Sequence, residues 1–439
     1  MIYAYHSIMT ENSWRAKWSQ TQLQGILREQ LNAFWQRPIG VKREQLATVL
    51  QYADAPHAVI VSGLRRAGKS TLLLQLAHTL GENAFYYVSF DDDRFLGFAA
   101  DDADTLLNAL VQAFGQRRIF IIDEVQNIEG WERFARRWMD QGYKLYITGS
   151  NAALLSRELG TRLTGRYLPV ELLPFSFGEY LTWAQQQDHA DATISTTPNT
   201  LVERALLNRA LSTYLQVGGI PEALQYPNLP ILRTLYDDVI YRDIATRHRI
   251  EAIRTLKELA FQVLSNPAGL VSFSKIKQQL GIGNVTTVKN YLQFLEDSWL
   301  IFTTYLYDAS VKRQQIAPKK AYGIDTGLVN TVGFHTSPNS GHLLENVVFL
   351  ALRRKTTNIH YALTPSGYEI DFYLPDQRLL VQVAQQLTNP QTYAREIRAL
   401  QDGLAMFKGA KGLLLSTDAE HFDAPQDDIQ ICSVSEWLL

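Results

Sequence analysis

An octapeptide at residues 63–70, GLRRAGKS, constrains the fold of this chain more than any other feature of its sequence. It has the pattern of a phosphate-binding loop, in which two glycines let the backbone curl with its N–H groups facing inward. The apolar run AVIVS precedes it, and the amphipathic run STLLLQLAHTL follows it. Because the motif needs a strand before it and a helix after it, this context favours a phosphate loop over a chance match in a glycine turn.

Strand and helix patterns alternate from residue 57 to about residue 150. Short apolar runs (AFYYVSF, RIFIID and KLYITGS) are separated by segments with helical spacing (DTLLNALVQAF and WERFARRWMDQ). Alternation of this kind predicts a parallel sheet with helices on both faces. We therefore predict an α/β fold in which the octapeptide lies at the carboxyl edge of the sheet, where such folds bind ligands.

The loop predicts a site for a nucleoside triphosphate. The Lys69 ammonium would reach the β- and γ-phosphates, the Ser70 hydroxyl would ligate Mg²⁺, and Thr71 would lie near the α-phosphate. No guanine-reading Asn-Lys-x-Asp motif occurs near the expected position, so ATP is the expected nucleotide. The residues expected to contact it are Gly63, Arg66, Ala67, Gly68, Lys69, Ser70 and Thr71.

Two carboxylates end the apolar run RIFIIDE. A hydrophobic strand that ends in Asp is the usual partner of a phosphate loop, and Asp123 would hold Mg²⁺ through water. Glu124 would orient and deprotonate the attacking water, which favours hydrolysis over transfer to another substrate. The alternative is that both carboxylates simply end a strand at the surface.

Polar and basic residues after the third strand are further candidates. Thr148, Ser150 or Asn151 could sense the γ-phosphate, although each could equally cap the helix that follows. Arg162 and Arg166 come next, and an arginine supplied to a neighbouring subunit would stabilise charge on the transferring phosphoryl group. Arg166 is the preferred candidate because it lies in a tight Thr-Gly-Arg turn, and a structural or solvated arginine is the alternative.

Length and composition predict a cytoplasmic protein with several structural units. The 439 residues exceed one ordinary core, and a net charge of -2 means that any nucleic-acid surface must be a local patch. The single cysteine, Cys432, fits a reducing compartment. The N-terminus lacks the pattern of a secretory signal, and no run reaches the roughly 18 apolar residues that span a bilayer.

Shifts in pattern divide the chain into five predicted parts. These are an N-terminal helical segment (1–50), a P-loop core (51–175), a helical lid (176–265), a winged-helix-like module (266–332) and a C-terminal α/β domain (333–439).

The fourth part resembles a winged helix-turn-helix. Two helices joined by a glycine turn precede the strand patterns IFTTYLYD and KKAYGID, and the second helix is expected to start at Asn284 or Thr286. In such modules the second helix enters the major groove of DNA, whereas a role as a protein-binding or rigid connector is the alternative. The candidate phosphate contacts are Lys289, Lys312, Arg313, Lys319 and Lys320.

Several motifs together resemble a known family. GLRRAGKS, IFIIDEVQ, YITGSNAALLS, LTGRYLPVELLPFSFGEY and GGIPEAL are similar to those of a group of prokaryotic AAA-like ATPases. The resemblance covers nearly the whole chain from about Arg43. In that group a restriction-endonuclease-like domain of uncertain function follows the ATPase, so the resemblance implies such a fold at the C-terminus.

The C-terminal part departs from an active nuclease. The helix-strand-strand order would place Glu345 on the helix, Glu369 and Asp371 on one strand, and Gln382 on the next. An active site of this type has Glu-x-Lys on the last strand, where this chain has Gln382-Val383-Ala384. Because the lysine is missing, we expect a degenerate site, although Arg395 could supply a migrated cation.

Three functions are compatible with these features. The first is an oligomeric, DNA-associated ATPase whose hydrolysis moves or remodels DNA, branched DNA included. The second is a regulatory switch that uses ATP binding and slow turnover to control assembly or partner exposure. The third is an ATP-dependent nuclease.

Overall fold

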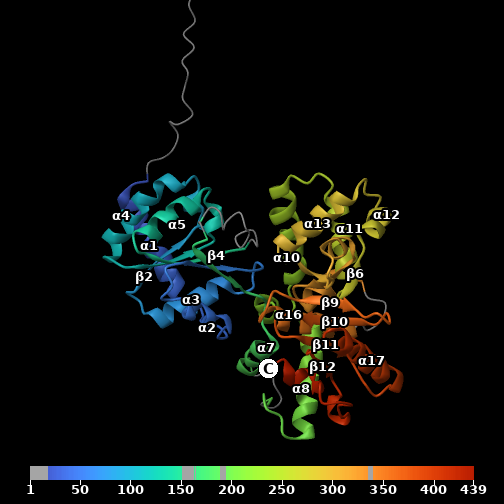
Figure 1. The fold of residues 1–439 in the computed structure, drawn as a ribbon. Helices are drawn as coiled ribbons and strands as arrows, with labels where there is room; N and C mark the ends of the chain where they lie inside the picture. Colours follow the sequence, from blue (N-terminus) through green and yellow to red (C-terminus); the bar gives the residue numbers. More distant parts are fainter. Residues whose placement is uncertain (1–17, 151–162, 164, 188–193, 335–339) are drawn as a thin grey trace, which may run out of the picture.

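The computed structural model describes residues 18–150, 163, 165–187, 194–334 and 340–439. These residues form two lobes, an N-terminal lobe around one sheet and a larger lobe built from the rest of the chain (Figure 1). Within the described residues no helix is long and apolar enough to cross a membrane.

The N-terminal lobe is a five-stranded parallel sheet with the order β2-β3-β4-β1-β5. The prediction of an α/β fold with a parallel sheet is therefore confirmed. The strands are β1 (Ala58–Ser62), β2 (Phe85–Ser89), β3 (Ile119–Asp123), β4 (Lys144–Gly149) and β5 (Tyr167–Glu171). The helices around them are α1 (Gln20–Trp35), α2 (Gln45–Gln51), α3 (Lys69–Leu80), α4 (Ala103–Phe114) and α5 (Trp131–Asp140), with short 3₁₀ turns at 93–95, 100–102 and 125–127.

Burial on both faces explains why the strands read as continuous apolar runs. One core contains α4 and α5 with alternate residues of the central strands, such as Ile60 and Ile122. A second core, on the other face, contains α2 and α3 with the intervening residues, such as Val61 and Ile121. A sheet covered on both faces cannot alternate polar and apolar residues, so its strands are apolar throughout.

Helices begin the second lobe. Capping boxes start the first two, at Ser176 with Glu179 and at Thr200 with Glu203. A wide π-helix follows directly after α10, and such helices are rare and occur frequently at functional sites. The elements are α7 (Phe177–Gln186), α8 (Leu201–Val217), α9 (Pro221–Gln225), α10 (Ile231–Asp238), the π-helix η5 (Val239–Thr246) and α11 (Ile253–Leu264).

One sheet of eight strands unites the remainder, with the order β13-β12-β11-β10-β9-β7-β8-β6. Its strands are β6 (Gly269–Val271), β7 (Ile301–Leu306), β8 (Lys319–Gly323), β9 (His360–Leu363), β10 (Glu369–Leu374), β11 (Leu379–Ala384), β12 (Lys411–Ser416) and β13 (Ile429–Ser433). The helices beside it are α12 (Phe273–Gln279), α13 (Val285–Asp297), α14 (Val311–Ile316), α15 (Thr326–Val332), α16 (Ser340–Arg353), α17 (Pro390–Met406) and α18 (Val434–Trp437), with a 3₁₀ turn at 419–421.

The boundary expected between residues 332 and 333 does not separate two sheets. Strand β7, from the winged-helix-like part, pairs in parallel with β9, from the C-terminal part, with Tyr305 opposite His360. The two expected modules therefore share one sheet. As edge strands of separate sheets, β7 and β9 would each expose unpaired backbone groups, and by pairing they satisfy these hydrogen bonds.

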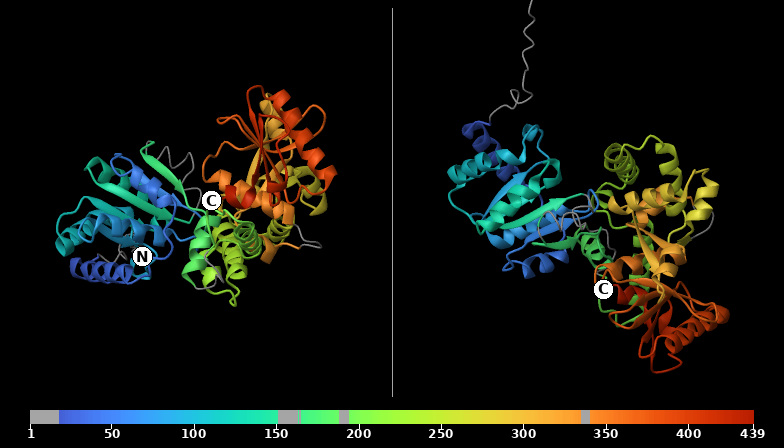
Figure 2. Two further views of the ribbon diagram at one scale, coloured as in Figure 1. Left: turned by 90° about the horizontal axis from the view of Figure 1, so that it is seen from below. Right: turned by 45° about the horizontal axis from the view of Figure 1, so that its top comes forward.

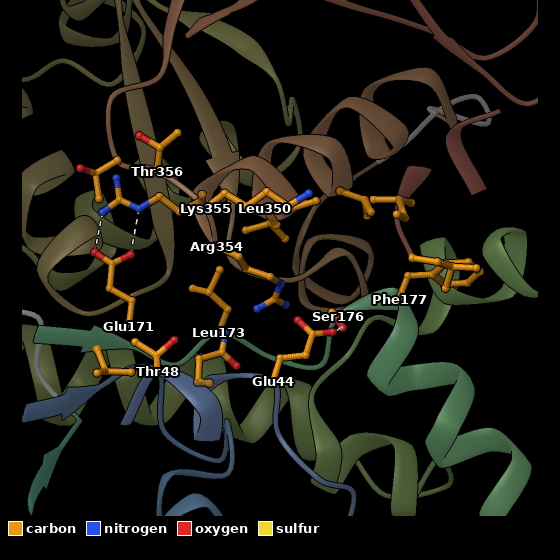
Figure 3. A pocket seen from close by; sticks show the side chains of 18 of the residues that line it. Glu44, Thr48, Glu171, Leu173, Ser176, Phe177, Leu350, Arg354, Lys355 and Thr356 are labelled. Atoms are coloured by element: carbon orange, nitrogen blue, oxygen red, sulfur yellow. Dashed lines mark hydrogen bonds and ion pairs between the residues drawn. The ribbon is translucent and has the colours of Figure 1, made fainter. Parts of the chain in front are cut away.

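The two lobes meet around a cavity of about 670 Å³. Arg353 of α16 makes a bidentate ion pair with Glu171 at the end of β5, at 2.6 and 2.9 Å, drawn with dashed lines in Figure 3. Arg354 donates to the carbonyl of Pro174 at 2.6 Å. Figure 2 shows the green helices that follow β5 at this junction, between the N-terminal sheet and the C-terminal strands.

Candidate nucleotide site

The glycines of the phosphate loop are required by close contacts and by backbone conformation. A Cβ on Gly63 would lie 2.1 Å from the carbonyl oxygen of Leu172. Gly68 has a φ of 95° and directly precedes α3, which starts at Lys69. A left-handed residue at this point turns the chain from the loop into the helix, so the N–H groups of the first helical turn face the loop.

Lys69 is buried but has no close anionic partner. Its side chain is 5% exposed, and its Nζ donates to the carbonyls of Gly63 and Leu64 at 3.1 Å each. The nearest carboxylate oxygen, of Glu124, lies 3.9 Å away. Burial lowers the pKa of Lys69, and the charges of Glu124 and Asp123 partly offset that effect. The ammonium can therefore gain strongly from an anion such as a phosphate oxygen.

Thr148, near the end of β4, bonds to both acidic residues at the end of the neighbouring strand β3. Its Oγ1 donates to Asp123 Oδ1 at 2.5 Å and accepts from the backbone N–H of Glu124 at 3.1 Å. Glu124 has a left-handed φ of 52°, which turns the chain sharply after β3. Gln126 donates to the carboxylate of Glu124 and lies 3.4 Å from the Oγ of Ser150.

Strand order brings these groups to one edge. Strand β4, which carries Thr148, lies between β3 and β1, so Asp123 and the phosphate loop flank it at the carboxyl edge of the sheet. Asp123 is 3% exposed, and Ser70 is partly buried in the first turn of α3. Carboxylate and hydroxyl oxygens suit Mg²⁺, and a buried ammonium suits phosphate, so the residues present fit a magnesium nucleotide.

Arg43 supports the loop from behind, and sequence patterns did not identify it. The Arg43 side chain is 1% exposed and donates to the carbonyls of Ala67 and Leu173 and to Glu179 at 2.6–2.9 Å. Its guanidinium also lies over the ring of Phe175. Arg43 therefore fixes the loop to α7 of the second lobe, and no local motif around residue 43 signals this role.

The two arginines inside the octapeptide also contact the second lobe. Arg65 makes a bidentate pair with Asp243 of the π-helix, at 2.6 and 2.8 Å. Arg66, which was expected to contact the nucleotide, donates to Glu222 of α9 at 3.0 Å and lies 4.0 Å from Asp238 of α10. The phosphate loop is thus held by carboxylates from three consecutive helices.

Arg166 lies at the opposite edge of the sheet from the phosphate loop. It directly precedes β5, which runs parallel to β1, and it pairs with Asp140 at 2.5 Å with 43% of its side chain exposed. It therefore does not reach the site of its own chain, and the expected alternatives of an intermolecular role and a structural role, such as the pair with Asp140, both remain. Asn151 and Arg162 lie outside the described residues.

The candidate DNA contacts separate into exposed and buried residues. Lys289 on α13 is exposed, as are Lys312 and Arg313 on α14, and Arg313 pairs with Asp308 at 3.2 Å. Helix α13 begins at Val285, between the two expected starts, with Asn284 as its N-cap. Lys319 is partly buried, donates to Thr303 and lies over the ring of Tyr305.

The expectation for Lys320 was wrong. Lys320 is 3% exposed, and its ammonium lies between Glu345 and Glu369, at 2.7 Å each, and Asp371, at 3.1 Å. Burial alone would lower the pKa of Lys320, but Tyr322 and the carboxylates outweigh it and raise the pKa well above its usual value. A cation in this position cannot contact a phosphate on the surface.

Lys320 instead pairs with Glu345, Glu369 and Asp371, the acids expected for a nuclease-like site, from a strand that the sequence did not suggest. Arg395, the expected alternative, is 65% exposed and pairs with Glu396. Gln382 accepts from the backbone N–H of Asp371 and donates to Glu396, so its amide is fully engaged. The acids open on one side to a pocket of about 530 Å³.

Comparison with known proteins defines the class of the N-terminal lobe. Residues 55–181 match the family described as an AAA domain, and residues 208–338 match a domain of unknown function, DUF8612. Together with the parallel sheet and the phosphate loop, this match identifies an AAA-like P-loop ATPase domain.

Two relatives are similar to this chain over most of its length. It is 33% identical over 362 residues to the uncharacterized protein MJ1544 of Methanocaldococcus jannaschii, covering 80% of this chain and 79% of that protein. The chain therefore belongs to the same family as that protein. It is also 29% identical over 416 residues to an uncharacterized protein of Haemophilus influenzae, covering 91% of this chain and 98% of that one.

Among solved structures, domain III of the replication initiation protein DnaA from Thermotoga maritima is similar to part of the chain. The identity is 17%, the match covers 41% of this chain and 85% of that one, and the TM-score is 0.26. Likeness at this level does not extend to function.

Proposed function

We propose that this protein hydrolyses ATP with Mg²⁺ at the carboxyl edge of the five-stranded sheet. The observation that carries the proposal is the placement of Lys69, Asp123 and Glu124 at one edge, with Thr148 bonded to both acidic residues. A phosphate loop alone would support binding, whereas a carboxylate next to the metal-binding aspartate also supports activation of water.

Each side chain has a distinct task in this mechanism. Lys69 exchanges its contacts to backbone carbonyls for phosphate oxygens, and the low exposure of the site strengthens that attraction. Ser70 and Asp123 would hold Mg²⁺, which would neutralise charge on the phosphates when bound. Thr148 fixes the position of Asp123, and Glu124 accepts the proton of the attacking water.

Replacement of the proposed base tests hydrolysis directly. Glu124→Gln should bind ATP with near-normal affinity but hydrolyse it about 10²–10⁴-fold more slowly, because an amide cannot accept the proton. Phosphate release and fluorescent-nucleotide binding measure the two effects separately. Glu129→Gln, an exposed acid in the same loop, is the matched control. Normal turnover by Glu124→Gln would show that the base is another group.

We also propose that ATP turnover is coupled to DNA, as a remodelling or translocating activity. The order of α12, α13, β7 and β8 resembles a winged helix and supports this proposal. Further support comes from the exposed basic side chains of Lys289, Lys312 and Arg313. ATPase rates should rise with duplex or four-way DNA and respond to salt. Indifference to linear, single-stranded and four-way DNA at two salt concentrations would favour the regulatory switch instead.

The proposed active form is an oligomer that shares its site. Arg166 lies at the far edge of its own sheet, where a neighbouring chain could receive it. Mixing Arg166→Ala with Lys69→Ala subunits should then restore turnover that neither variant has alone.

For the C-terminal strands we propose a restriction-endonuclease-like fold that does not cut DNA. The three acids are already paired with Lys320, and Gln382 is held by its neighbours, which leaves few groups to bind metal and activate water. Magnesium-dependent nicking that is abolished by Asp371→Ala would instead establish the nuclease.

A further inference from the structure

The π-helix η5 (Val239–Thr246) presents one carboxylate to the phosphate loop. Asp243 has only 8% of its side chain exposed, and both of its oxygens bind the guanidinium of Arg65, at 2.6 and 2.8 Å. Bidentate pairs of this kind are among the strongest and most directional polar contacts in proteins. This pair therefore links the π-helix directly to the phosphate loop.

The same segment carries arginines on its outside. Arg242, Arg247 and Arg249 are all exposed, and within the described part of the chain none of them forms an ion pair or a side-chain hydrogen bond. Arg249 has a left-handed φ of 51°, which turns the chain after the helix. The acidic residue Glu251 follows, but arginines still outnumber acidic residues in the segment 241–254.

An aromatic and basic rim continues this surface toward α11. Tyr241 is 45% exposed, and the ammonium of Lys257 lies over its ring. Phe261 is equally exposed, and both rings line a pocket of about 800 Å³ that also includes Arg254. Exposed aromatic rings beside arginines suit a nucleic-acid chain, because bases stack on the rings and phosphates meet the guanidinium groups.

We propose that residues 241–254 bind the phosphate backbone of DNA and that Asp243 couples this binding to the nucleotide site. The inference rests on the proposed coupling of ATP turnover to DNA and names its contact surface. Of the residues expected earlier, Lys320 is buried and Arg313 is paired with Asp308, whereas Arg242, Arg247 and Arg249 are exposed. Arg242 is exposed and the next residue, Asp243, is buried against the phosphate loop. A DNA backbone bound by Arg242 would therefore shift the carboxylate of Asp243.

Arg65 has two possible partners. It belongs to the phosphate loop, so a bound triphosphate would attract its guanidinium in competition with Asp243. A DNA-induced shift of the π-helix would loosen the Arg65–Asp243 pair and release Arg65 toward the phosphates. Asp243 is therefore a positioning residue, and its effect should appear in the response of ATP turnover to DNA.

Removal of the outer arginines tests the surface. In the full chain, Arg242→Gln/Arg247→Gln/Arg249→Gln should weaken binding of a fluorescein-labelled duplex about tenfold or more at low salt. The slope of log affinity against log salt should become shallower by about three, one for each lost phosphate contact. The matched control is Arg398→Gln/Lys408→Gln/Lys411→Gln, three exposed cations at α17 and β12. A triple variant that is folded by thermal melting and binds DNA like the control overturns the proposed surface.

Conservative replacement of Asp243 tests the coupling. Asp243→Asn should lose the DNA-dependent change in ATP turnover while its affinity for the duplex stays within about threefold. Asp243→Glu keeps the charge and should recover much of the DNA-dependent change in ATP turnover. If Asp243 had a purely structural role, the effect of a substitution would not depend on whether it keeps the charge. A full DNA response in Asp243→Asn overturns the coupling.

Wild-type behaviour separates the two levels of inference. If wild-type protein neither binds DNA nor changes its ATP turnover with DNA, then the proposed DNA function fails and this inference fails with it. If wild-type protein responds but the arginine variant matches the control, then only the assignment of residues 241–254 fails. Single-stranded and duplex probes in parallel identify which form of the backbone the surface prefers.

Discussion

Two buried lysines, one in each lobe, stand in opposite electrostatic situations. Lys69 rests on two backbone carbonyls with its nearest carboxylate 3.9 Å away, and its pKa is lowered. Lys320 touches three carboxyl groups within 3.1 Å, and its pKa is raised. Both side chains lie at or below 5% exposure, so the difference comes from their partners rather than from burial.

This contrast distinguishes a cation available for a ligand from one that serves the fold. The charge of Lys69 is poorly compensated, so an incoming phosphate would improve its environment. The charge of Lys320 is overcompensated, so it stabilises its neighbours and has little to offer a phosphate. Of the two clusters, the one at the phosphate loop is the one suited to chemistry.

The largest expected effect comes from Lys69→Ala. Loss of the ammonium should reduce ATP turnover at least about 10²–10³-fold, because a preorganised charge at the phosphates is removed. Phosphate release and nucleotide binding measure it, with the exposed Lys408→Ala as the control. The melting temperature should change little, since Lys69 has no close ionic partner to strand. Normal ATP turnover by Lys69→Ala would contradict the assignment of Lys69 as the cation that binds phosphate.

Lys320→Ala should act on stability instead. It leaves Glu345, Glu369 and Asp371 without their shared cation, and breaking a buried pair in this way costs about 3–5 kcal/mol. Thermal or urea unfolding measures the loss, and Lys319→Ala, the partly buried neighbour, is the control. If Lys320→Ala were as stable as Lys319→Ala, the pairing of Lys320 with the three acids would not stabilise the eight-stranded sheet.

The sequence predicted the site residues that lie close together along the chain. The residues of the phosphate loop lie in one turn, and Asp123 ends one strand, so Lys69 and Asp123 could be found from spacing and flanking elements. Thr148 was named from its place at a strand end, but its bonds to both acids depend on the order of the strands. That order is set by packing, which the sequence does not display.

The remaining contacts join distant parts of the chain. Arg65 and Asp243 are separated by 178 positions, and Arg43 and Glu179 by 136. Lys320 was expected to contact phosphates as part of the winged-helix-like module, whereas the pairing of β7 with β9 joins its strand to the strands that carry two of the acids. No spacing rule links such residues, and an arginine or lysine in a basic stretch reads as solvated until its partner is placed.

A pH dependence of stability is also expected, and it belongs to the Lys320 cluster. Burial, with a further contribution from Asp371, raises the pKa of Glu345 from 4.5 to about 8. The folded state therefore binds this proton more tightly than the unfolded state. The resulting stability is fully present below pH 4.5, and it is lost as the pH rises to about 8.

Glu345→Gln should flatten this dependence. Asp325 acts in the same direction, but its pKa is raised by burial only to about 6, so above pH 6 the difference between wild type and Glu345→Gln reports Glu345. Melting temperatures of wild type, Glu345→Gln and Asp325→Asn across pH 5–8.5 measure both contributions. The Asp325→Asn curve should keep its fall above pH 6, and the Glu345→Gln curve should lose it. Parallel curves for all three proteins above pH 6 would mean that Lys320 holds Glu345 ionised, which would make the cluster a simple ion pair rather than a proton-sharing one.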